Sequence, residues 1–458
     1  MSQIIASVSG VRGITGDSLT PQNIIKFTTA FAIYCRKHSK SNKIAVGRDG
    51  RLHGELISDI VVSTLSMAGF QVINTGVVPT PTLQIATEDL KCAGGIEITA
   101  SHNPQIWNGL KFLNSDGTFP DAHQIKEITN IAETGEQEFV KVTKILKPIN
   151  DFLWIDKHIQ KVLNHKLINI KKIKSARFKV VVDAVNSAAS VIAPKLLHKL
   201  GCKVIELYCD GSGIFPHTPE PLPKNLKLLC KSVVKHKADM GIAIDPDSDR
   251  LVFITEKGLP FVEENTIVAF VKNVIKNSRA RTKNITVNLS TTRAVEDIAC
   301  RYGGKVFRSP VGEINVVKEM QKNKSIAGGE GSGGVILPDV HYGRDAIIGI
   351  GVLLQEFADS GLKLSDYKKT IPCYFILKTK IENVVNADLL FEKIYKKYKP
   401  EMCRITTTDG LKLDFAGHWI HLRKSNTEPI VRIIIEAKSK EHAEKIQEEF
   451  LGEVEKYI

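Results

Sequence analysis

The sequence of 458 residues lacks the marks of several protein classes. Its eight cysteines are scattered, without a Cys-x-x-Cys pair, which argues against a disulfide framework or a zinc site and favours a reducing compartment. The N-terminus has neither the basic region nor the length of a signal peptide, and no apolar run approaches the ~18 residues that a membrane helix needs. We therefore expect a cytoplasmic protein without a membrane partner.

Aromatic residues are also few, at 7% of the chain, although the net charge of +13 is strongly basic. The densest group of lysines lies at residues 157–179, where it is interleaved with aliphatic residues such as Leu163 and Ile170. Sites for single-stranded nucleic acid combine basic with aromatic residues that stack on bases, so this segment has the pattern of a solvated amphipathic face instead. We expect no nucleic-acid partner, and an anionic small substrate explains the charge only loosely.

Strand and helix patterns alternate over most of the chain, which predicts layered α/β domains. A chain of this length holds roughly three or four domains of on the order of 100–150 residues each. The pattern runs three times and then changes to an α+β texture that includes a strand at residues 431–437. We expect three similar layered α/β domains and a smaller C-terminal α+β domain, at residues 1–150, 151–257, 258–370 and 371–458.

The first candidate site follows an apolar run that ends at Ile98 and is expected to be a buried strand. Residues 99–104, Thr-Ala-Ser-His-Asn-Pro, form a loop here called the serine loop, because Asn-Pro disfavours helix. Ser101 is a candidate nucleophile that needs a base, a metal or a phosphate of its own, and His102 and Lys111 are the nearby groups. On its own, a plain turn with an incidental histidine explains the segment equally well.

The second candidate site is Asp-Pro-Asp-Ser-Asp-Arg at residues 245–250, here called the acidic loop. Carboxylates at alternating positions of an extended segment share a face, and three like charges so close repel unless a divalent cation lies among them. Glu256 falls at the twelfth position of an EF-hand calcium loop, but Arg250 replaces the glycine required at the sixth. Mg²⁺ sharing a phosphate oxygen is therefore favoured over a solvated acidic turn. The candidate ligands are Asp245, Asp247 and Asp249.

Three more loops carry groups that suit a phosphorylated sugar. In the glycine loop, residues 329–333, Glu330 and Ser332 alternate and can both bind sugar hydroxyls, although a plain hairpin turn is an equal alternative. The arginine loop, residues 423–429, offers a guanidinium fork, hydroxyls and backbone N–H groups, which suit a phosphate dianion. Arg12 lies between two glycines and can approach an anion, although that motif alone favours a surface turn.

In this order, the four loops that begin at residues 99, 245, 329 and 423 resemble those of the α-D-phosphohexomutase family. The serine loop matches the family's phosphoserine loop letter for letter, and the acidic loop matches its Asp-x-Asp-x-Asp-Arg metal loop. The glycine loop matches its Gly-Glu-x-Ser-Gly sugar loop, and the arginine loop its phosphate-binding loop. Supporting matches lie at residues 9–13, 47–49, 79–81 and 215–221. The resemblance spans nearly the whole chain and implies domains arranged around one central cleft.

The resemblance implies an isomerase that interconverts hexose 1-phosphate and hexose 6-phosphate by phosphoryl transfer. Ser101 would carry a phosphoryl group and, with the three aspartates, hold Mg²⁺, while a hexose 1,6-bisphosphate would be intermediate and activator. Positive charge around the phosphoryl group would come from Arg12, Lys111 and Arg250. The sugar ring would be held by Glu330 and Ser332, and the phosphate that does not react by Arg423, Ser425, Asn426, Thr427 and Arg432.

One position departs from the family pattern. Many members carry a histidine directly after the sugar loop, as a proton-transfer residue, whereas this chain has Gly334 there. The proton would then pass through His102, Lys111 or His341, or the hydroxyl would lose its proton without a dedicated base.

The identity of the sugar is less defined than the reaction. The glycine loop and residues 343–345 are most similar to a subgroup assigned to glucosamine phosphate, while closely similar chains are phosphomannomutases or phosphoglucomutases. Two other hypotheses are a phosphosugar-binding protein without turnover, and a bisphosphate synthase or phosphatase that uses the same phosphoserine. The sequence leaves both a monomer and a homodimer open.

Overall fold

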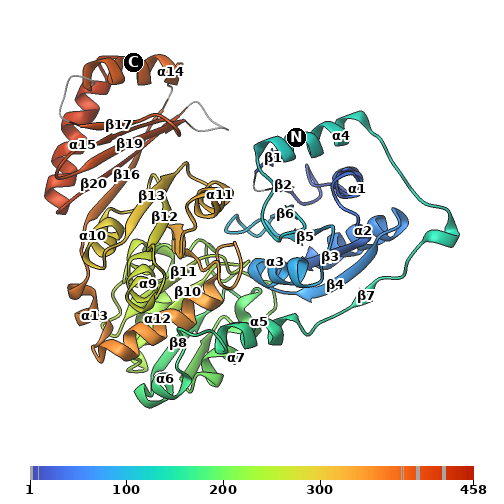
Figure 1. The fold of residues 1–458 in the computed structure, drawn as a ribbon, viewed down its shortest axis with the longest axis horizontal. Coiled ribbons are helices and arrows are strands. Elements are labelled where there is room, and N and C mark those ends of the chain that lie inside the picture. The colour runs from blue at the N-terminus through green and yellow to red at the C-terminus, as the bar shows by residue number, and fades with distance from the viewer. Residues whose placement is uncertain are drawn as a thin grey trace.

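The computed structural model describes residues 4–8, 10–382, 384, 386–398, 403–424 and 430–457. In this part of the chain the strands form four separate sheets, each accompanied by helices (Figure 1). Three α/β units precede a smaller C-terminal unit, which confirms the predicted fold class. The expected domain boundaries and the central cleft stay predictions.

The first sheet has the strand order β1-β2-β6-β5-β3-β4-β7 and contains parallel and antiparallel pairs. Helices α1, α2 and α4 pack on one face and α3 on the other, so the central strand β5 is buried along its whole length. Thr20 caps α1 and Pro21 takes its first position. The elements are β1 (Ile5–Ser7), β2 (Gly10–Ile14), α1 (Pro21–His38), β3 (Lys43–Arg48), α2 (Gly54–Met67), β4 (Gln71–Val77), α3 (Thr80–Asp89), β5 (Gly94–Ile98), β6 (Trp107–Leu113), α4 (Ala122–Thr134) and β7 (Ile149–Asn150).

The second sheet has the order β11-β10-β8-β9, and the acidic loop joins its antiparallel strands β10 and β11. Both of these strands are buried throughout, which fixes the start and the end of the loop. The elements are α5 (Trp154–Leu163), α6 (Ile170–Ala176), β8 (Lys179–Asp183), α7 (Ala189–Lys199), β9 (Lys203–Leu207), α8 (Lys227–Lys235), β10 (Met240–Ile244) and β11 (Leu251–Thr255).

The third sheet has the order β13-β12-β14-β15, and the glycine loop lies at the turn between β14 and β15. Its helices share one continuous apolar core with the second unit, so the two middle units are packed as one body. The elements are α9 (Glu263–Asn277), β12 (Asn284–Asn288), α10 (Ala294–Arg301), β13 (Lys305–Ser309), α11 (Glu313–Asn323), β14 (Ala327–Glu330), β15 (Gly334–Ile336), α12 (Ala346–Ser360) and α13 (Leu364–Tyr367).

The fourth sheet is antiparallel, with the order β16-β20-β19-β18-β17, and α14 and α15 contribute to a core of its own. The arginine loop begins at the end of β19 and precedes β20. The elements are β16 (Phe375–Ile381), α14 (Ala387–Tyr398), β17 (Arg404–Thr406), β18 (Leu411–Asp414), β19 (Trp419–Lys424), β20 (Val431–Ala437) and α15 (Lys440–Val454).

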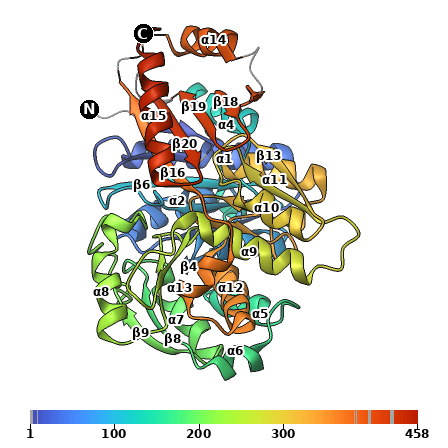
Figure 2. The ribbon, with the colours of Figure 1, turned by 90° about the vertical axis from the view of Figure 1, so that its left-hand side faces the viewer.

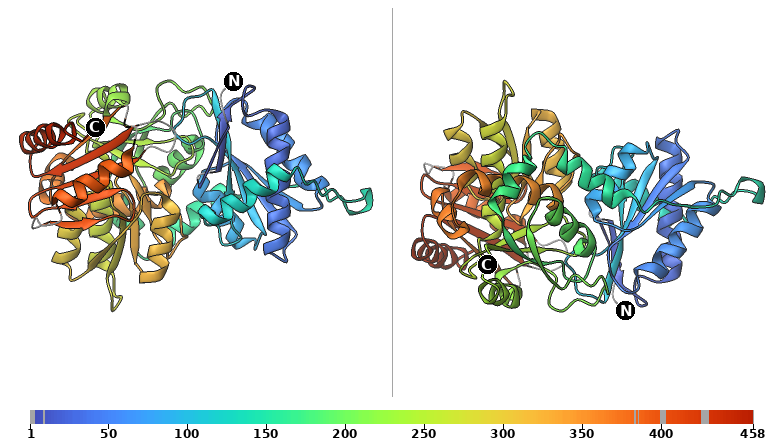
Figure 3. Two further views of the ribbon diagram at one scale, coloured as in Figure 1. Left: turned by 90° about the horizontal axis from the view of Figure 1, so that it is seen from above. Right: turned by 90° about the horizontal axis from the view of Figure 1, so that it is seen from below.

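The first and fourth units lie apart, with the two middle units connecting them. Figure 1 shows the first unit in blue on the right and the fourth in red at the upper left. Figure 3 shows the same order, and Figure 2, in which the first unit lies behind the others, shows the green and yellow middle units packed against each other. None of the helices described is long and apolar enough to cross a membrane.

Candidate active site

The serine loop leaves β5 in a strained conformation. Ser101 has a backbone φ of 52°, in the left-handed region that residues other than glycine rarely adopt. Its N–H donates to Thr99 Oγ1 at 2.8 Å, and the Thr99 hydroxyl donates to Asp49 Oδ2 at 2.7 Å. These contacts hold Ser101 Oγ at 3.5 Å from Asp245 Oδ2 and 3.3 Å from His102 Nδ1.

A buried arginine holds the serine loop by its backbone. Arg51 is fully buried, and its Nε lies 3.0 Å from Asp49 Oδ2. Its guanidinium donates to the main-chain oxygen of Ser101, to that of Asn103 at 3.0 Å and to that of Pro104 at 3.1 Å. Asp49 belongs to a motif noted in the sequence, whereas no local signal there pointed to Arg51.

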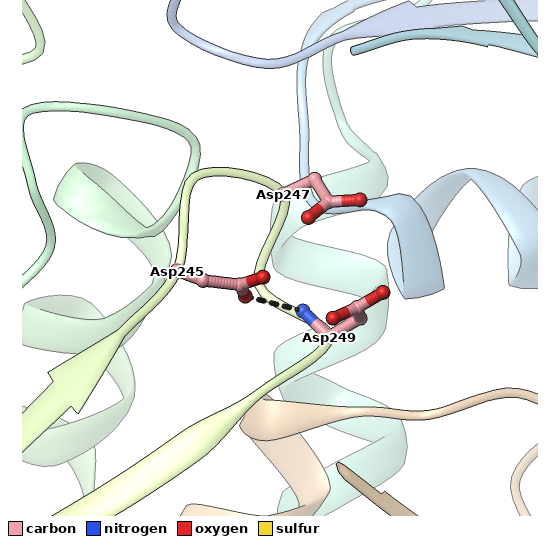
Figure 4. A group of neighbouring side chains, drawn as sticks. All are labelled: Asp245, Asp247 and Asp249. Atoms are coloured by element: carbon pink, nitrogen blue, oxygen red, sulfur yellow. Dashed lines mark hydrogen bonds between the residues drawn. The ribbon is translucent and has the colours of Figure 1, made fainter. Parts of the chain in front are cut away.

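The three aspartates of the acidic loop gather near one point (Figure 4). Asp245, Asp247 and Asp249 are buried, and one oxygen atom of each lies within 4.8 Å of the others. The backbone N–H of Asp249 donates to Asp245 Oδ1 at 3.0 Å (Figure 4), and that of Arg250 donates to the same oxygen at 3.0 Å. The loop backbone therefore fixes the first carboxylate.

Protein donors occupy one oxygen of the other two carboxylates and leave the second oxygen open. Asp247 Oδ2 accepts from Lys111 and, at 2.9 Å, from the hydroxyl of Thr80. Asp249 Oδ2 lies 2.5 Å from a terminal nitrogen of Arg344 and 3.5 Å from Lys111 Nζ. Oδ1 of each aspartate is buried without a hydrogen-bond partner. Buried oxygens of this kind are costly unless a cation binds them, and an all-oxygen set fits Mg²⁺.

Burial and neighbouring charges set the ionisation of this group. Burial, and then the carboxylates of Asp249 and Asp247, raise the pKa of Asp245 well above its usual range. Burial opposes the charged form of Lys111, but Asp247 and Asp249 outweigh it and raise the Lys111 pKa. Burial also opposes ionisation of Asp249, but Arg344 and Lys111 outweigh it and lower the Asp249 pKa. A lysine that stays charged supplies positive charge and does not suit the role of a base.

Two arginines and a histidine surround Ser101. Arg12 donates to Asn103 Oδ1 at 3.0 Å, and Arg250 extends from the end of the acidic loop. Burial, and then the positive charges of Arg250 and Arg12, lower the pKa of His102 to about 3. The imidazole is therefore neutral at physiological pH, and its Nδ1 can accept a hydrogen bond from the serine hydroxyl.

The other histidine considered for proton transfer belongs to a separate cluster. His341 Nε2 lies 3.2 Å from Asp345 Oδ2, and the same oxygen lies 2.9 Å from His158 Nε2. Asp345 also caps α12 by accepting from the N–H groups of Ile347 and Ile348. These contacts assign His341 to the support of a helix start, whereas His102 is the histidine that contacts Ser101.

The glycine loop presents a carboxylate that protein donors already hold in place. Glu330 Oε1 accepts from Asn288 Nδ2 at 2.9 Å and from the backbone N–H of Gly312 at 3.1 Å. Its Oε2 lies 2.7 Å from Arg344, a residue that the sequence analysis did not assign to the site. Ser332 is half-buried at the turn of the same hairpin. The glycine and acidic loops are thus joined through one arginine.

Two arginines on the strands that flank the arginine loop lie side by side. Arg423 on β19 pairs directly with Arg432 on β20, so both side chains lie on the same face of the sheet. Like charges in such a pair repel, which favours an anion between them. Asp409 Oδ2 accepts from Arg423 at 2.9 Å and from the N–H of Val311 at 2.8 Å, which links this sheet to the third unit. The predicted phosphate ligands Ser425, Asn426 and Thr427 lie outside the described residues.

This geometry suits the transfer of a phosphoryl group between a serine and a bound small molecule. It places the protein in the class of multidomain α/β phosphotransfer enzymes. The models of the phosphoglucomutase/phosphomannomutase family match nearly the whole chain, with alpha/beta/alpha domain I at residues 4–139, domain II at 156–258, domain III at 263–374 and the C-terminal domain at 379–453. The chain belongs to the phosphoglucomutase/phosphomannomutase family.

Individual relatives agree with this assignment. The chain is 35% identical over 449 residues to a phosphoglucomutase/phosphomannomutase of Thermococcus kodakarensis, covering 96% of each chain. It is 32% identical over 457 residues to a probable phosphoglucosamine mutase of Methanopyrus kandleri, covering 98% of this chain and 97% of the relative. A crystal structure of a phosphoglucomutase/phosphomannomutase family protein from Burkholderia thailandensis superimposes with a TM-score of 0.85 at 26% identity, covering 97% of each chain.

Proposed function

We propose that this protein is a phosphohexomutase that interconverts hexose 1-phosphate and hexose 6-phosphate, with glucosamine phosphate as its preferred substrate. The observation that carries the proposal is the placement of Ser101 Oγ at a strand end, 3.5 Å from an oxygen of a buried aspartate triad. Two neighbouring carboxylate oxygens in that triad lack a protein donor. A serine that carries a phosphoryl group would complete an oxygen cage for Mg²⁺ there.

The reaction would exchange phosphoryl groups between Ser101 and the sugar. The phosphoryl group on Ser101 Oγ passes to the free hydroxyl of a bound hexose monophosphate; the bond to Oγ breaks, the bond to the sugar oxygen forms, and the sugar hydroxyl loses its proton. The resulting 1,6-bisphosphate reorients, and its other phosphoryl group returns to Ser101 Oγ. After one cycle the sugar again carries one phosphoryl group and Ser101 again carries one. No cosubstrate is therefore consumed.

Charge neutralisation is the main task of the surrounding residues, because phosphoryl transfer needs little covalent help. Asp245, Asp247 and Asp249 would hold Mg²⁺, which when bound neutralises charge on the phosphoryl oxygens. Lys111 stays charged beside this group, and Arg12 and Arg250 would add positive charge around the transferred group. His102 would accept or return the proton of the reacting hydroxyl, in place of the histidine that Gly334 replaces, because the negative charge of bound phosphate groups would offset the positive charges of Arg250 and Arg12 that help to lower its pKa.

The substrate would be held at both ends. Glu330 and Ser332 would bind ring hydroxyls in either orientation of the bisphosphate. Residues of the fourth unit would hold the phosphate that does not react: Arg423, Ser425, Asn426, Thr427 and Arg432. The pairing of two arginines on one sheet face supports this part of the proposal.

The names of two relatives indicate the candidate sugars. One relative is a probable phosphoglucosamine mutase, and another is a phosphoglucomutase/phosphomannomutase. The glycine loop and residues 343–345 favour glucosamine phosphate, and a phosphomannomutase or phosphoglucomutase is the second candidate.

The test is kcat/KM for the 1-phosphates of glucosamine, mannose and glucose, with Mg²⁺ and a trace of the matching 1,6-bisphosphate. The kcat/KM for glucosamine 1-phosphate is expected to exceed that for the other two sugars by more than tenfold. The Ser101→Ala variant is expected to be inactive on all three. Equal rates would make the protein a broad hexose mutase. Absence of turnover with all three sugars, or an active Ser101→Ala variant, would contradict the proposed mechanism.

A further inference from the structure

The glycine that follows the glycine loop leaves room for one particular side chain. A Cβ atom added at Gly334 would lie 2.3 Å from Arg344 Cδ and 3.0 Å from Arg344 Cγ. Carbon atoms do not approach so closely, so any larger residue at position 334 would displace the aliphatic part of this arginine. Gly334 and Arg344 therefore form a complementary pair across β15 and the segment that precedes α12.

The guanidinium of Arg344 contacts three carboxylates from separate parts of the chain. Its Nε lies 2.8 Å from Glu313 at the start of α11, and one terminal nitrogen lies 2.7 Å from Glu330 in the glycine loop. The second terminal nitrogen lies 2.5 Å from Asp249 in the acidic loop. The side chain is 11% exposed, so these ion pairs are largely shielded from water. Each of the three nitrogens of the planar guanidinium contacts a carboxylate, which the single nitrogen of an ammonium group could not reproduce.

Each contact decides which carboxylate oxygen stays available. At Asp249, Arg344 binds Oδ2 and leaves Oδ1 without a hydrogen-bond partner. At Glu330, donors from Asn288 and Gly312 share Oε1, and Arg344 binds Oε2. A carboxylate offers about four acceptor positions, so one position on Oε2 remains for a ligand hydroxyl. Contacts of one arginine thus leave one oxygen of Asp249 and one acceptor position of Glu330 open.

We infer that Arg344 is a positioning residue that sets the metal ligand Asp249 and the sugar ligand Glu330 together, so that cation binding and sugar binding depend on the same side chain. The inference rests on the proposed function for the roles of these two carboxylates. Partners that orient metal ligands contribute on the order of 10–100-fold in metal affinity, and the fork geometry of arginine provides such an orientation at two sites here.

The test compares two variants that disturb Arg344 in different ways. Arg344→Gln removes its charge and fork, while Gly334→Ala keeps every charged group and displaces the arginine by the added Cβ. For each we would measure the Mg²⁺ dissociation constant of the free enzyme by calorimetry, KM for glucosamine 1-phosphate at saturating Mg²⁺, and Tm. Both variants are expected to bind Mg²⁺ about tenfold more weakly and to show a KM raised about tenfold. Arg344→Lys should recover only part of either effect.

Two control variants separate this effect from general damage. Thr80→Val removes a donor to Asp247 only, so it should weaken Mg²⁺ binding and leave KM at saturating Mg²⁺ unchanged. Gly417→Ala adds a Cβ with nothing within 4 Å, so it should leave both constants unchanged.

The outcomes are distinct. If Arg344→Gln and Gly334→Ala keep both constants within twofold of the wild type, the inference is wrong, whatever happens to Tm. If only one constant changes, Arg344 serves one loop and the coupling is wrong. If the wild-type protein binds Mg²⁺ but turns over no hexose phosphate, the proposed function fails while the metal half of the inference is still measured.

Discussion

The guanidinium of Arg51 donates to the main-chain oxygen of Ser101, so a fully buried side chain holds the candidate nucleophile through its backbone. The same guanidinium also donates to the main-chain oxygen of Asn103 and contacts the carboxylate of Asp49. This carboxylate in turn accepts from the hydroxyl of Thr99. Both ends of the serine loop are therefore tied to one ion pair. A loop with a left-handed serine is strained, and this ion pair is the observed device that resists its relaxation.

We expect Arg51→Lys to lower kcat about a hundredfold while KM changes much less. The amine keeps the charge beside Asp49 but cannot reach the main-chain oxygens of the loop together, so Ser101 moves by a fraction of an ångström or more. Loss of buried hydrogen bonds should also lower the free energy of unfolding by about 3 kcal/mol. Steady-state kinetics and urea unfolding measure the two effects.

The neighbouring Arg48 supplies the control. It pairs at 3.5 Å with Glu55, whose side chain is 76% exposed, and donates to the main-chain oxygen of Asp49 at 3.3 Å but to no atom of the serine loop, which the structure describes throughout. Arg48→Lys should therefore change stability by less than about 1 kcal/mol and leave kcat unchanged. An Arg51→Lys variant with wild-type kcat would show that the serine loop keeps its conformation without this ion pair.

The aspartate triad predicts a stability that depends on divalent cation. Burial and the neighbouring carboxylates raise the pKa of Asp245, so the charged form of this carboxylate opposes folding when no cation neutralises it, whereas Lys111 and Arg344 already stabilise the charge of Asp249. Mg²⁺ at a hundredfold excess over its dissociation constant should therefore stabilise the protein by about 2.7 kcal/mol. Asp245→Asn should raise Tm in EDTA and abolish the response to Mg²⁺. A variant that responds to Mg²⁺ like the wild type would place the cation elsewhere.

Much of the fold and the set of candidate loops follow from local sequence patterns. Strand β20 is a largely apolar run, and its bounds agree with the predicted ones, residues 431–437. The serine and acidic loops come directly after buried strands, so their position in the fold could be predicted as well. The resemblance to phosphohexomutases was carried by these loops, and the comparisons confirm it.

The contacts that support the loops could not be predicted in the same way. Thr80 reaches Asp247 across 167 positions of the chain, and Arg344 reaches Asp249 across 95. No periodicity links such residues, because the contacts arise only when separate sheets pack together. Gly334 illustrates the same limit: in the sequence it is a departure from a pattern, and only the structure shows the arginine that fills the space.

The contact between the third and fourth units predicts a loss of stability at acidic pH. His421 Nε2–H donates to the main-chain oxygen of Asp409 at 2.8 Å, and Nδ1 lies 2.9 Å from Ser290 Oγ and accepts from it. Burial is the main cause that lowers the pKa of His421 to about 4, from an ordinary value of about 6.5. The neutral folded form is therefore favoured above the unfolded pKa, and stability is lost as the pH falls from 6.5 toward 4.

At pH 5 this single group should lower the free energy of unfolding by about 2 kcal/mol relative to pH 7. Urea unfolding at both pH values measures the difference. His421→Gln should remove about that share of the pH dependence, whereas His123→Gln, at an exposed position, should leave it unchanged. An unaltered pH dependence in His421→Gln would assign the effect to other groups.

The glycine loop predicts a compensating pair of substitutions. A Cβ atom at Gly331 would lie 2.1 Å from both carboxylate oxygens of Glu264, which is buried in α9 and accepts from the N–H of Thr292 at 3.0 Å. Gly331→Ala should therefore displace the loop and raise KM for the hexose phosphate about tenfold. Glu264→Asp withdraws the carboxylate by one methylene, so the double variant should recover most of the loss, with a coupling of roughly 1 kcal/mol in kcat/KM. Additive effects of the two substitutions would show that the loop tolerates the added methyl group by another route, and that Glu264 does not set its position.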